Sequence, residues 1–172
     1  PSTGLPTKTE QSDLLQAVNG RNGEAPVPVL AIRSPRDAFG TVYEAARIAL
    51  EHMTPVIVLS DGYIANGAEP WRFPKSNDLP EITPPFVTEK PNGKYLPYKR
   101  DEKGVRSWAP AGTKGFEHRI GGLEKEMETG NVSYDPMNHE IMVKQREDKI
   151  NRIKDYIPPQ KIERGTIQDE IL

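Results

Sequence analysis

Two apolar runs separated by one amphipathic stretch constrain the fold of this chain most. Residues 28–33 (PVLAIR) form an apolar run of strand length, and residues 55–60 (PVIVLS) are continuously apolar and rich in β-branched residues. The second pattern is typical of a strand buried on both faces of a parallel sheet. Between the runs, apolar residues from Phe39 to Met53 recur at helical spacing. Strand, helix and strand predict a βαβ unit with a right-handed crossover, and therefore an α/β fold.

Residues 34–37 (SPRD) predict the start of the connecting helix. We expect Ser34 to accept a hydrogen bond from a free amide as N-cap, with Pro35 at the first helical position. The negative charge of Asp37 would then interact favourably with the positive N-terminal end of the helix dipole. A shorter helix is predicted around residues 11–18.

A second long helix is predicted near the C-terminus. Asp135 is a good N-cap residue and Pro136 suits the first helical position. The helix is expected to run through residues 137–155, with an apolar stripe among many charges, and to end before Pro158 and Pro159.

A proline-rich segment separates these parts. Eight prolines between residues 70 and 110 interrupt every candidate helix, yet the segment also carries six aromatic residues: Trp71, Phe73, Phe86, Tyr95, Tyr98 and Trp108. Disordered linkers are poor in aromatic residues. We therefore expect an ordered, extended arm that packs against a neighbour, with a small hairpin turn at residues 91–93 (PNG).

The composition predicts an incomplete domain. Hydrophobic residues make up 35% of the 172 residues and the mean hydropathy is −0.68, which predicts a small core for this length. Two strands do not complete a sheet, and the chain begins with Pro1, so we expect a piece of a longer protein. The expected division is residues 1–76 (α/β domain), 77–134 (arm) and 135–172 (helix and linker).

Charge and residue usage exclude several function classes. The net charge is −2 and both signs are spread along the chain, so nothing indicates a nucleic-acid or anionic-membrane partner. No signal peptide is visible, and no apolar run approaches the roughly 20 residues that span a bilayer, so we expect a cytoplasmic protein. Cysteine is absent, which excludes thiol catalysis and a cysteine-held iron–sulfur cluster on this chain.

The residues alone indicate few candidate sites. Ser2, Thr3 and Gly4 place hydroxyl groups beside glycine, a pattern that binds phosphate or carboxylate but more often forms a turn. Lys8 suits an anion, although most single lysines are only solvated. Asp61 follows the second predicted strand, at the edge where α/β sheets bind ligands; the alternative is that it caps the next turn.

The sequence contains no recognisable catalytic or metal-binding set. No nucleophile, base and orienting group can be assembled, and the three histidines are not at metal-ligand spacing. From the residues alone, the prediction stops at an α/β piece with an interaction arm.

Several segments together resemble one family. Residues 1–14 (PSTGLPTKTEQSDL) resemble the GPSTGLPT-x-TEQ-x-DL signature in alpha subunits of 2-oxoacid:ferredoxin oxidoreductases, and residues 54–61 (TPVIVLSD) resemble the family's PVI-x-LSD strand. Residues 96–98 (LPY) extend the match. Residues 117–124 (EHRIGGLE) and 129–136 (TGNVSYDP) resemble segments typical of the 2-oxoglutarate-type alpha subunit.

The resemblance implies a fold and an activity. It implies the pyrimidine-binding domain of a thiamine-diphosphate enzyme that oxidatively decarboxylates a 2-oxoacid, reduces ferredoxin and forms an acyl-coenzyme A. The alpha subunit would hold the aminopyrimidine, while the beta subunit would bind the diphosphate, its Mg²⁺ and an iron–sulfur cluster. The arm would wrap the beta subunit.

The resemblance also implies where the site lies. Residues 2–11 resemble the loop near the thiazole ring and the substrate, while residues 61–63 resemble a strand end whose role in the family is structural. The residues expected near substrate or cofactor are Ser2, Thr3, Gly4, Thr7, Lys8, Asp61 and Tyr63. The family's activating glutamate, its substrate threonine and an arginine precede the signature. They would precede Pro1, so we expect this piece alone to lack catalysis and to hold no cofactor or metal.

Two alternatives stay open at this stage. The segment is either part of an enzyme or a non-catalytic segment whose main role is subunit assembly. Pyruvate and branched-chain 2-oxoacids also remain alternatives to 2-oxoglutarate as the substrate.

Overall fold

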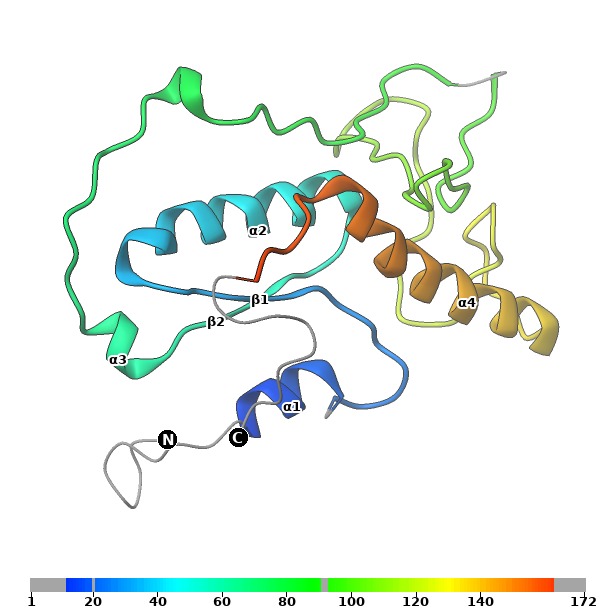
Figure 1. Cartoon of the computed structure of the whole chain (residues 1–172). Coiled ribbons are helices and arrows are strands. Elements are labelled where there is room, and N and C mark those ends of the chain that lie inside the picture. Colours follow the sequence, from blue (N-terminus) through cyan, green and yellow to red (C-terminus); the bar gives the residue numbers. More distant parts are fainter. Residues whose placement is uncertain (1–11, 20, 91–92, 163–172) are drawn as a thin grey trace.

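A parallel βαβ unit forms the N-terminal half of the computed structural model, which describes residues 12–19, 21–90 and 93–162 (Figure 1). Strand β1 (Val29–Ala31) leads through helix α2 (Ala38–His52) to strand β2 (Ile57–Leu59). The strands pair in parallel, with Val29 opposite Ile57 and Ala31 opposite Leu59. This confirms the predicted α/β class and the order of its elements.

The entry to α2 differs from the prediction. Residues Pro35–Asp37 wind as a 3-10 helix, η1, and the Ser34 hydroxyl caps no amide. Instead, the Ser34 carbonyl accepts from the amide of Asp37 at 3.0 Å. The Asp37 carboxylate accepts from the Arg33 amide and the Thr41 hydroxyl, both at 3.1 Å. The predicted Ser34 cap is therefore wrong, because the tighter 3-10 turn puts Asp37 at the start of α2.

Two short helices flank the unit. Helix α1 (Ser12–Val18) confirms the short helix predicted near the N-terminus. Helix α3 (Gly62–Ala65) follows β2 directly. A further 3-10 turn, η2 (Ser76–Asp78), lies in the long segment that follows.

Helix α4 (Pro136–Arg152) begins as the sequence predicts. The Asp135 carboxylate accepts from the Met137 amide at 2.9 Å, so it satisfies one of the amides left free at a helix start. Four more residues continue the helix as the 3-10 turn η4 (Ile153–Tyr156), and the helical segment ends before Pro158. Both the cap and the end of this helix are confirmed.

The proline-rich arm consists of two different parts. Residues 67–85 form a mostly exposed strap that runs around α2 (Figure 1). The Tyr43 hydroxyl donates to the Pro80 carbonyl at 2.6 Å, and the Thr83 amide donates to Glu51 at 3.0 Å. Residues 86–90 and 93–134 instead form loops that pack back on the chain. Two of the three residues of the predicted hairpin turn at 91–93, residues 91 and 92, lie outside the described residues, and Phe86 forms a β-bridge with Trp108.

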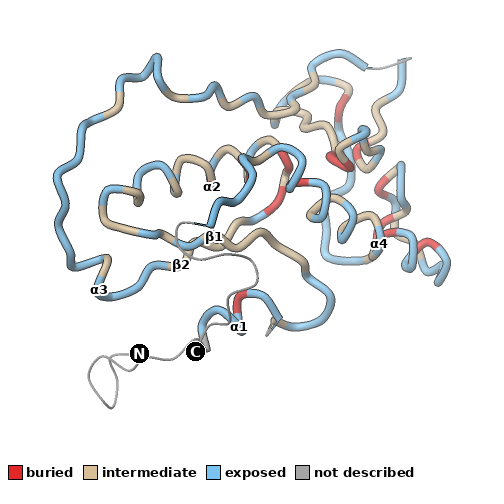
Figure 2. Tube along the Cα trace, in the orientation of Figure 1, coloured by how far each residue is buried: buried red, intermediate tan, exposed pale blue. Residues whose placement is uncertain are grey.

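The core lies beside the sheet rather than on it. Figure 2 shows buried residues where the arm loops, α4 and the end of α2 meet. The buried apolar side chains in this region are Ala45, Ile48, Val105, Phe116, Met142 and Ile153. No residue of β1 or β2 is fully buried, so both strands keep partly exposed surface. None of the described helices is long and apolar enough to span a lipid bilayer.

The cap of α4 gives a direct test of the fold. Replacing Asp135 with Ala should weaken the first turn of α4 by about 0.5–2 kcal/mol, because the Met137 amide loses its acceptor. Amide hydrogen exchange at residues 137–139 should speed up accordingly. Asp135→Asn is the matched control, since asparagine caps almost as well; equal protection in all three proteins would contradict the assignment.

Candidate functional site

The carboxyl ends of the two strands form the first candidate site. The chain leaves β1 toward Ser34 and leaves β2 toward Asp61, and α/β sheets bind their ligands at this edge. The Asp61 carboxylate accepts from the Tyr63 amide at 2.7 Å and so caps α3. Tyr63 itself is 89% exposed. Of the two alternatives for Asp61, the structure therefore contains the capping contact, while a ligand role for Asp61 and Tyr63 stays a prediction.

The two loops at this edge are tied to each other. The Glu69 carboxylate accepts from the Arg36 amide at 3.0 Å and also from the Ser34 hydroxyl. These bonds, the one from Arg36 first, hold the pKa of Glu69 below its usual value. Nearby, a Cβ on Gly67 would lie 3.1 Å from Cγ of Pro35 and 3.2 Å from the Tyr63 carbonyl, so glycine permits the close approach. No pattern in the sequence indicated Glu69 or Gly67 as site residues.

The remaining predicted site residues cannot be placed. Ser2, Thr3, Gly4, Thr7 and Lys8 lie outside the described residues. Their proximity to a substrate or cofactor stays a prediction.

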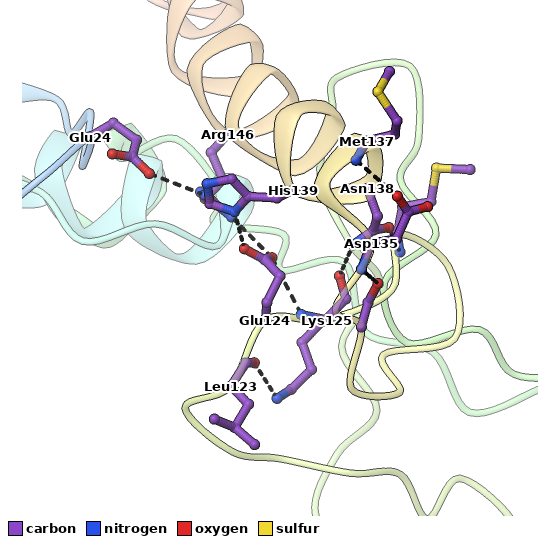
Figure 3. Close-up of polar contacts among 11 residues, drawn as sticks. Glu24, Leu123, Glu124, Lys125, Asp135, Met137, Asn138, His139 and Arg146 are labelled. Carbon is purple, nitrogen blue, oxygen red and sulfur yellow. Dashed lines mark hydrogen bonds and ion pairs between the residues drawn. The ribbon is translucent and has the colours of Figure 1, made fainter.

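A second polar cluster joins the arm to α4 (Figure 3). Nδ1 of His139 lies 2.6 Å from Oε2 of Glu124, and the Arg146 guanidinium lies 3.9 Å from the other carboxylate oxygen. The hydrogen bond from His139 is the main reason that the pKa of Glu124 lies below its usual value. On its other side, Arg146 lies 4.0 Å from Glu24. Three distant parts of the sequence thus meet at this cluster.

A buried amide fixes the same arm loop to the helix. Asn138 is only 7% exposed. Its side-chain oxygen accepts from the Met127 amide at 3.0 Å, and its nitrogen donates to the Lys125 carbonyl at 2.8 Å. Because both polar atoms are paired, burial of this side chain stabilises one arrangement of loop and helix.

Several cationic side chains lie beside this cluster, and two of them have lowered pKa values. Lys149 donates to the Met53 carbonyl at 2.9 Å, and burial together with nearby Arg100 and Arg106 lowers the pKa of Lys149 to about 8. Burial, then Arg106 and Arg146, lower the pKa of Arg100 to about 10. The helical spacing of Arg146 and Lys149 puts them on one face of α4. Nothing in the sequence indicated that Arg100 and Arg106 would lie opposite them, so this group of cations was not predicted.

Metal ligands do not gather in the described part of the chain. No group of three or more His, Asp or Glu side chains there is placed to hold a metal ion.

Comparisons with known proteins point to one family. The family model described as pyruvate flavodoxin/ferredoxin oxidoreductase, thiamine diP-bdg (thiamine-diphosphate-binding), matches residues 1–138. The chain is 54% identical to the 2-oxoglutarate oxidoreductase subunit KorA of Mycobacterium tuberculosis, over 100% of this chain and 26% of that protein. It is 31% identical to the 2-oxoglutarate synthase subunit KorA of Methanothermobacter marburgensis, over 91% of this chain and 41% of that protein.

A solved structure is similar over almost the whole chain. It is the 2-oxoglutarate:ferredoxin oxidoreductase from Magnetococcus marinus with 2-oxoglutarate, coenzyme A and succinyl-CoA bound. The TM-score is 0.78 and the sequence identity 34%, over 95% of this chain and 28% of that chain. This chain therefore spans only about a quarter to two-fifths of the length of the relatives named here.

The lowered pKa of Lys149 can be measured by chemical labelling. Only the neutral amine reacts with a small acylating reagent, so Lys149 should react half-maximally near pH 8. The pKa of an unfolded lysine is about 10.4, so between about pH 8 and about pH 10 the unfolded state binds more protons than the folded state. The contribution of Lys149 to the free energy of unfolding therefore rises as the pH increases from about 8 to about 10. Lys144 on the same helix is the control, since Glu140 raises its pKa. Equal labelling profiles for the two lysines would contradict the assignment.

Proposed function

The chain belongs to the pyruvate flavodoxin/ferredoxin oxidoreductase family, in its thiamine-diphosphate-binding part, and we propose that it is a piece of the alpha subunit of a 2-oxoacid:ferredoxin oxidoreductase acting on 2-oxoglutarate. The observation that carries this proposal is the 54% identity, over the whole chain, to a 2-oxoglutarate oxidoreductase subunit. The structural likeness to a 2-oxoglutarate:ferredoxin oxidoreductase, at a TM-score of 0.78 and 34% identity, also supports it.

The proposed reaction is an oxidative decarboxylation. One 2-oxoglutarate and one coenzyme A yield succinyl-CoA, carbon dioxide and one proton, while two ferredoxins each take up one electron. When bound, thiamine diphosphate supplies the electron sink for breaking the bond to the carboxylate. Ferredoxin and coenzyme A are therefore proposed partners of the whole enzyme.

At the strand edge, the carboxylates of Asp61 and Glu69 already accept hydrogen bonds from the chain itself. The carboxylate of Asp61 is engaged in capping α3, and that of Glu69 ties two loops together. In the proposal, the beta subunit holds the diphosphate, the Mg²⁺ and an iron–sulfur cluster. The absence of cysteine from this chain supports that division. The βαβ unit would support the substrate-side loop at residues 2–11, and no step of the reaction is assigned to the described residues.

The arm has a proposed role in assembly. Residues 1–76 would complete the pyrimidine domain, residues 77–134 would contact the beta subunit, and residues 135–172 would lead to a following domain of a cytoplasmic protein. Exposed aromatic residues in and just before the arm favour a subunit contact, because Phe73 and Phe86 are 77% and 57% exposed. The same observation supports the second candidate function, a segment that serves assembly only.

Acceptor reduction by the full-length protein with its partner subunit tests the proposed function. With coenzyme A and a low-potential dye, 2-oxoglutarate should be oxidised with a kcat/KM at least about tenfold above that of pyruvate or a branched-chain 2-oxoacid, a difference of about 1.4 kcal/mol. A reversed order would reject 2-oxoglutarate as the substrate. No reduction with any 2-oxoacid would favour the assembly role.

Lys8 is the residue proposed to select a dicarboxylic substrate. Its ammonium would pair with the distal carboxylate, so Lys8→Ala should lower kcat/KM for 2-oxoglutarate by about tenfold to a hundredfold, since a charge-assisted contact is worth roughly 1.5–3 kcal/mol. The loss for pyruvate should be much smaller. Lys144→Ala, an exposed lysine paired with Glu140, is the control. Equal losses on all substrates would indicate a structural role for Lys8 instead.

A further inference from the structure

A cavity of about 360 Å³ lies where the arm loops face α4. Small-molecule sites in proteins commonly measure roughly 300–1,000 Å³, so the cavity is large enough for a small ligand. Five cationic side chains and one carboxylate line it: Arg100, Arg106, Lys125, Arg146, Lys149 and Glu124. The single carboxylate does not balance this charge.

Four of the five cations make only neutral contacts. Within residues 12–19, 21–90 and 93–162, Arg100, Arg106, Lys125 and Lys149 form no ion pair, and Lys125 donates to the Leu123 carbonyl at 2.6 Å. Arg100 donates to the Gln145 side chain at 3.1 Å and to the Gly104 carbonyl at 2.8 Å. The Arg106 guanidinium lies 4.2 Å from the centre of the Tyr98 ring. The carboxylate that lines the cavity, Glu124, is already shared by His139 and Arg146.

Grouping these cations is costly unless an anion joins them. Arg100 and Lys149 are half-buried, and each is repelled by neighbouring cations. Charges withdrawn from water in proteins are normally paired, because desolvation without a partner is unfavourable. The hydrogen bonds to neutral carbonyl and amide oxygens orient the cations, but they supply no negative charge.

We propose that this cavity binds the phosphate group of a small anionic ligand. A phosphate carries up to two negative charges and several acceptor oxygens, whereas one carboxylate carries a single charge and leaves more of the excess uncompensated. Planar guanidinium groups bind phosphate through two parallel hydrogen bonds, and two arginines approach from one loop. Gly121 and Gly122 line the same cavity, and Gly122 meets no atom within 4 Å of its would-be Cβ, so the backbone there is open to a ligand.

The charged side chains of this site come from the arm and α4, and neither Asp61 nor Tyr63 lines it. Two sources share the recognised chemistry, free inorganic phosphate and the phosphate of an organic ester.

Calorimetric titration of the full-length protein with its partner subunit, in phosphate-free buffer near pH 7, tests the site. Inorganic phosphate should bind, and Arg106→Gln should weaken this binding about tenfold or more, as expected for loss of a charge-assisted contact. Lys144→Gln is the matched control, because this exposed lysine on α4 pairs with Glu140 and lies outside the cavity. Wild-type affinity in Arg106→Gln, or acetate binding as tightly as phosphate, would overturn the proposal.

Protection of Lys149 gives a second readout that needs no variant. A bound phosphate would raise the fraction of protonated Lys149 and cover its amine, so acylation at pH 8 should slow when phosphate is added and not when acetate is added. ADP distinguishes the two sources, since protection at lower concentrations of ADP than of phosphate indicates an ester and the reverse indicates free phosphate. Labelling that neither anion changes would overturn the site, even if Arg106→Gln did not fold.

Discussion

The packing of α4 against the arm loops and the end of α2 is the interaction on which the rest of this structure depends. The two-stranded sheet buries too little to support itself, and most of the buried apolar side chains lie instead at this junction, among them Ile48, Val105 and Met142. Burying one such aliphatic side chain contributes about 1.5–3 kcal/mol. Asn138 makes this apolar contact specific, because its two hydrogen bonds form only when the arm loop is placed in one orientation against α4. The loops that carry the charged cavity are therefore positioned by the same junction that stabilises the chain.

Local signals in the sequence predicted the regular elements well. Two apolar runs separated by an amphipathic stretch identified the βαβ unit. Asp135 and Pro136 identified the start of α4, because capping depends only on residues adjacent in the sequence. The same reasoning failed at Ser34, where a 3-10 turn competes with an α-helical start and the two differ by one residue in register. Such small differences in local geometry are not encoded by residue type alone.

Contacts between distant residues were not predictable in the same way. The arm was expected to be extended apart from one hairpin turn, yet its second half folds back, since Arg100 donates to Gln145 and Arg152 donates to the Glu102 carbonyl across long stretches of sequence. At the candidate site, the capping role of Asp61 followed from its neighbours, whereas the tie between Glu69 and Arg36 joins residues 33 positions apart. The resemblance to a family supplied the expected chemistry, which no pattern of spacing or charge in the chain indicates.

The strap at residues 67–85 makes few contacts with the rest of the chain but adopts one backbone conformation. Prolines occupy five of the positions from 70 to 85. Each proline ring fixes one backbone dihedral before folding begins, so the unfolded chain samples fewer conformations. The strap therefore loses less conformational entropy when it becomes ordered than a flexible linker would. Its two hydrogen bonds to α2 have a smaller entropy loss to offset. A segment stiffened in this way keeps its exposed aromatic side chains oriented before any partner arrives, which lowers the entropy lost on association.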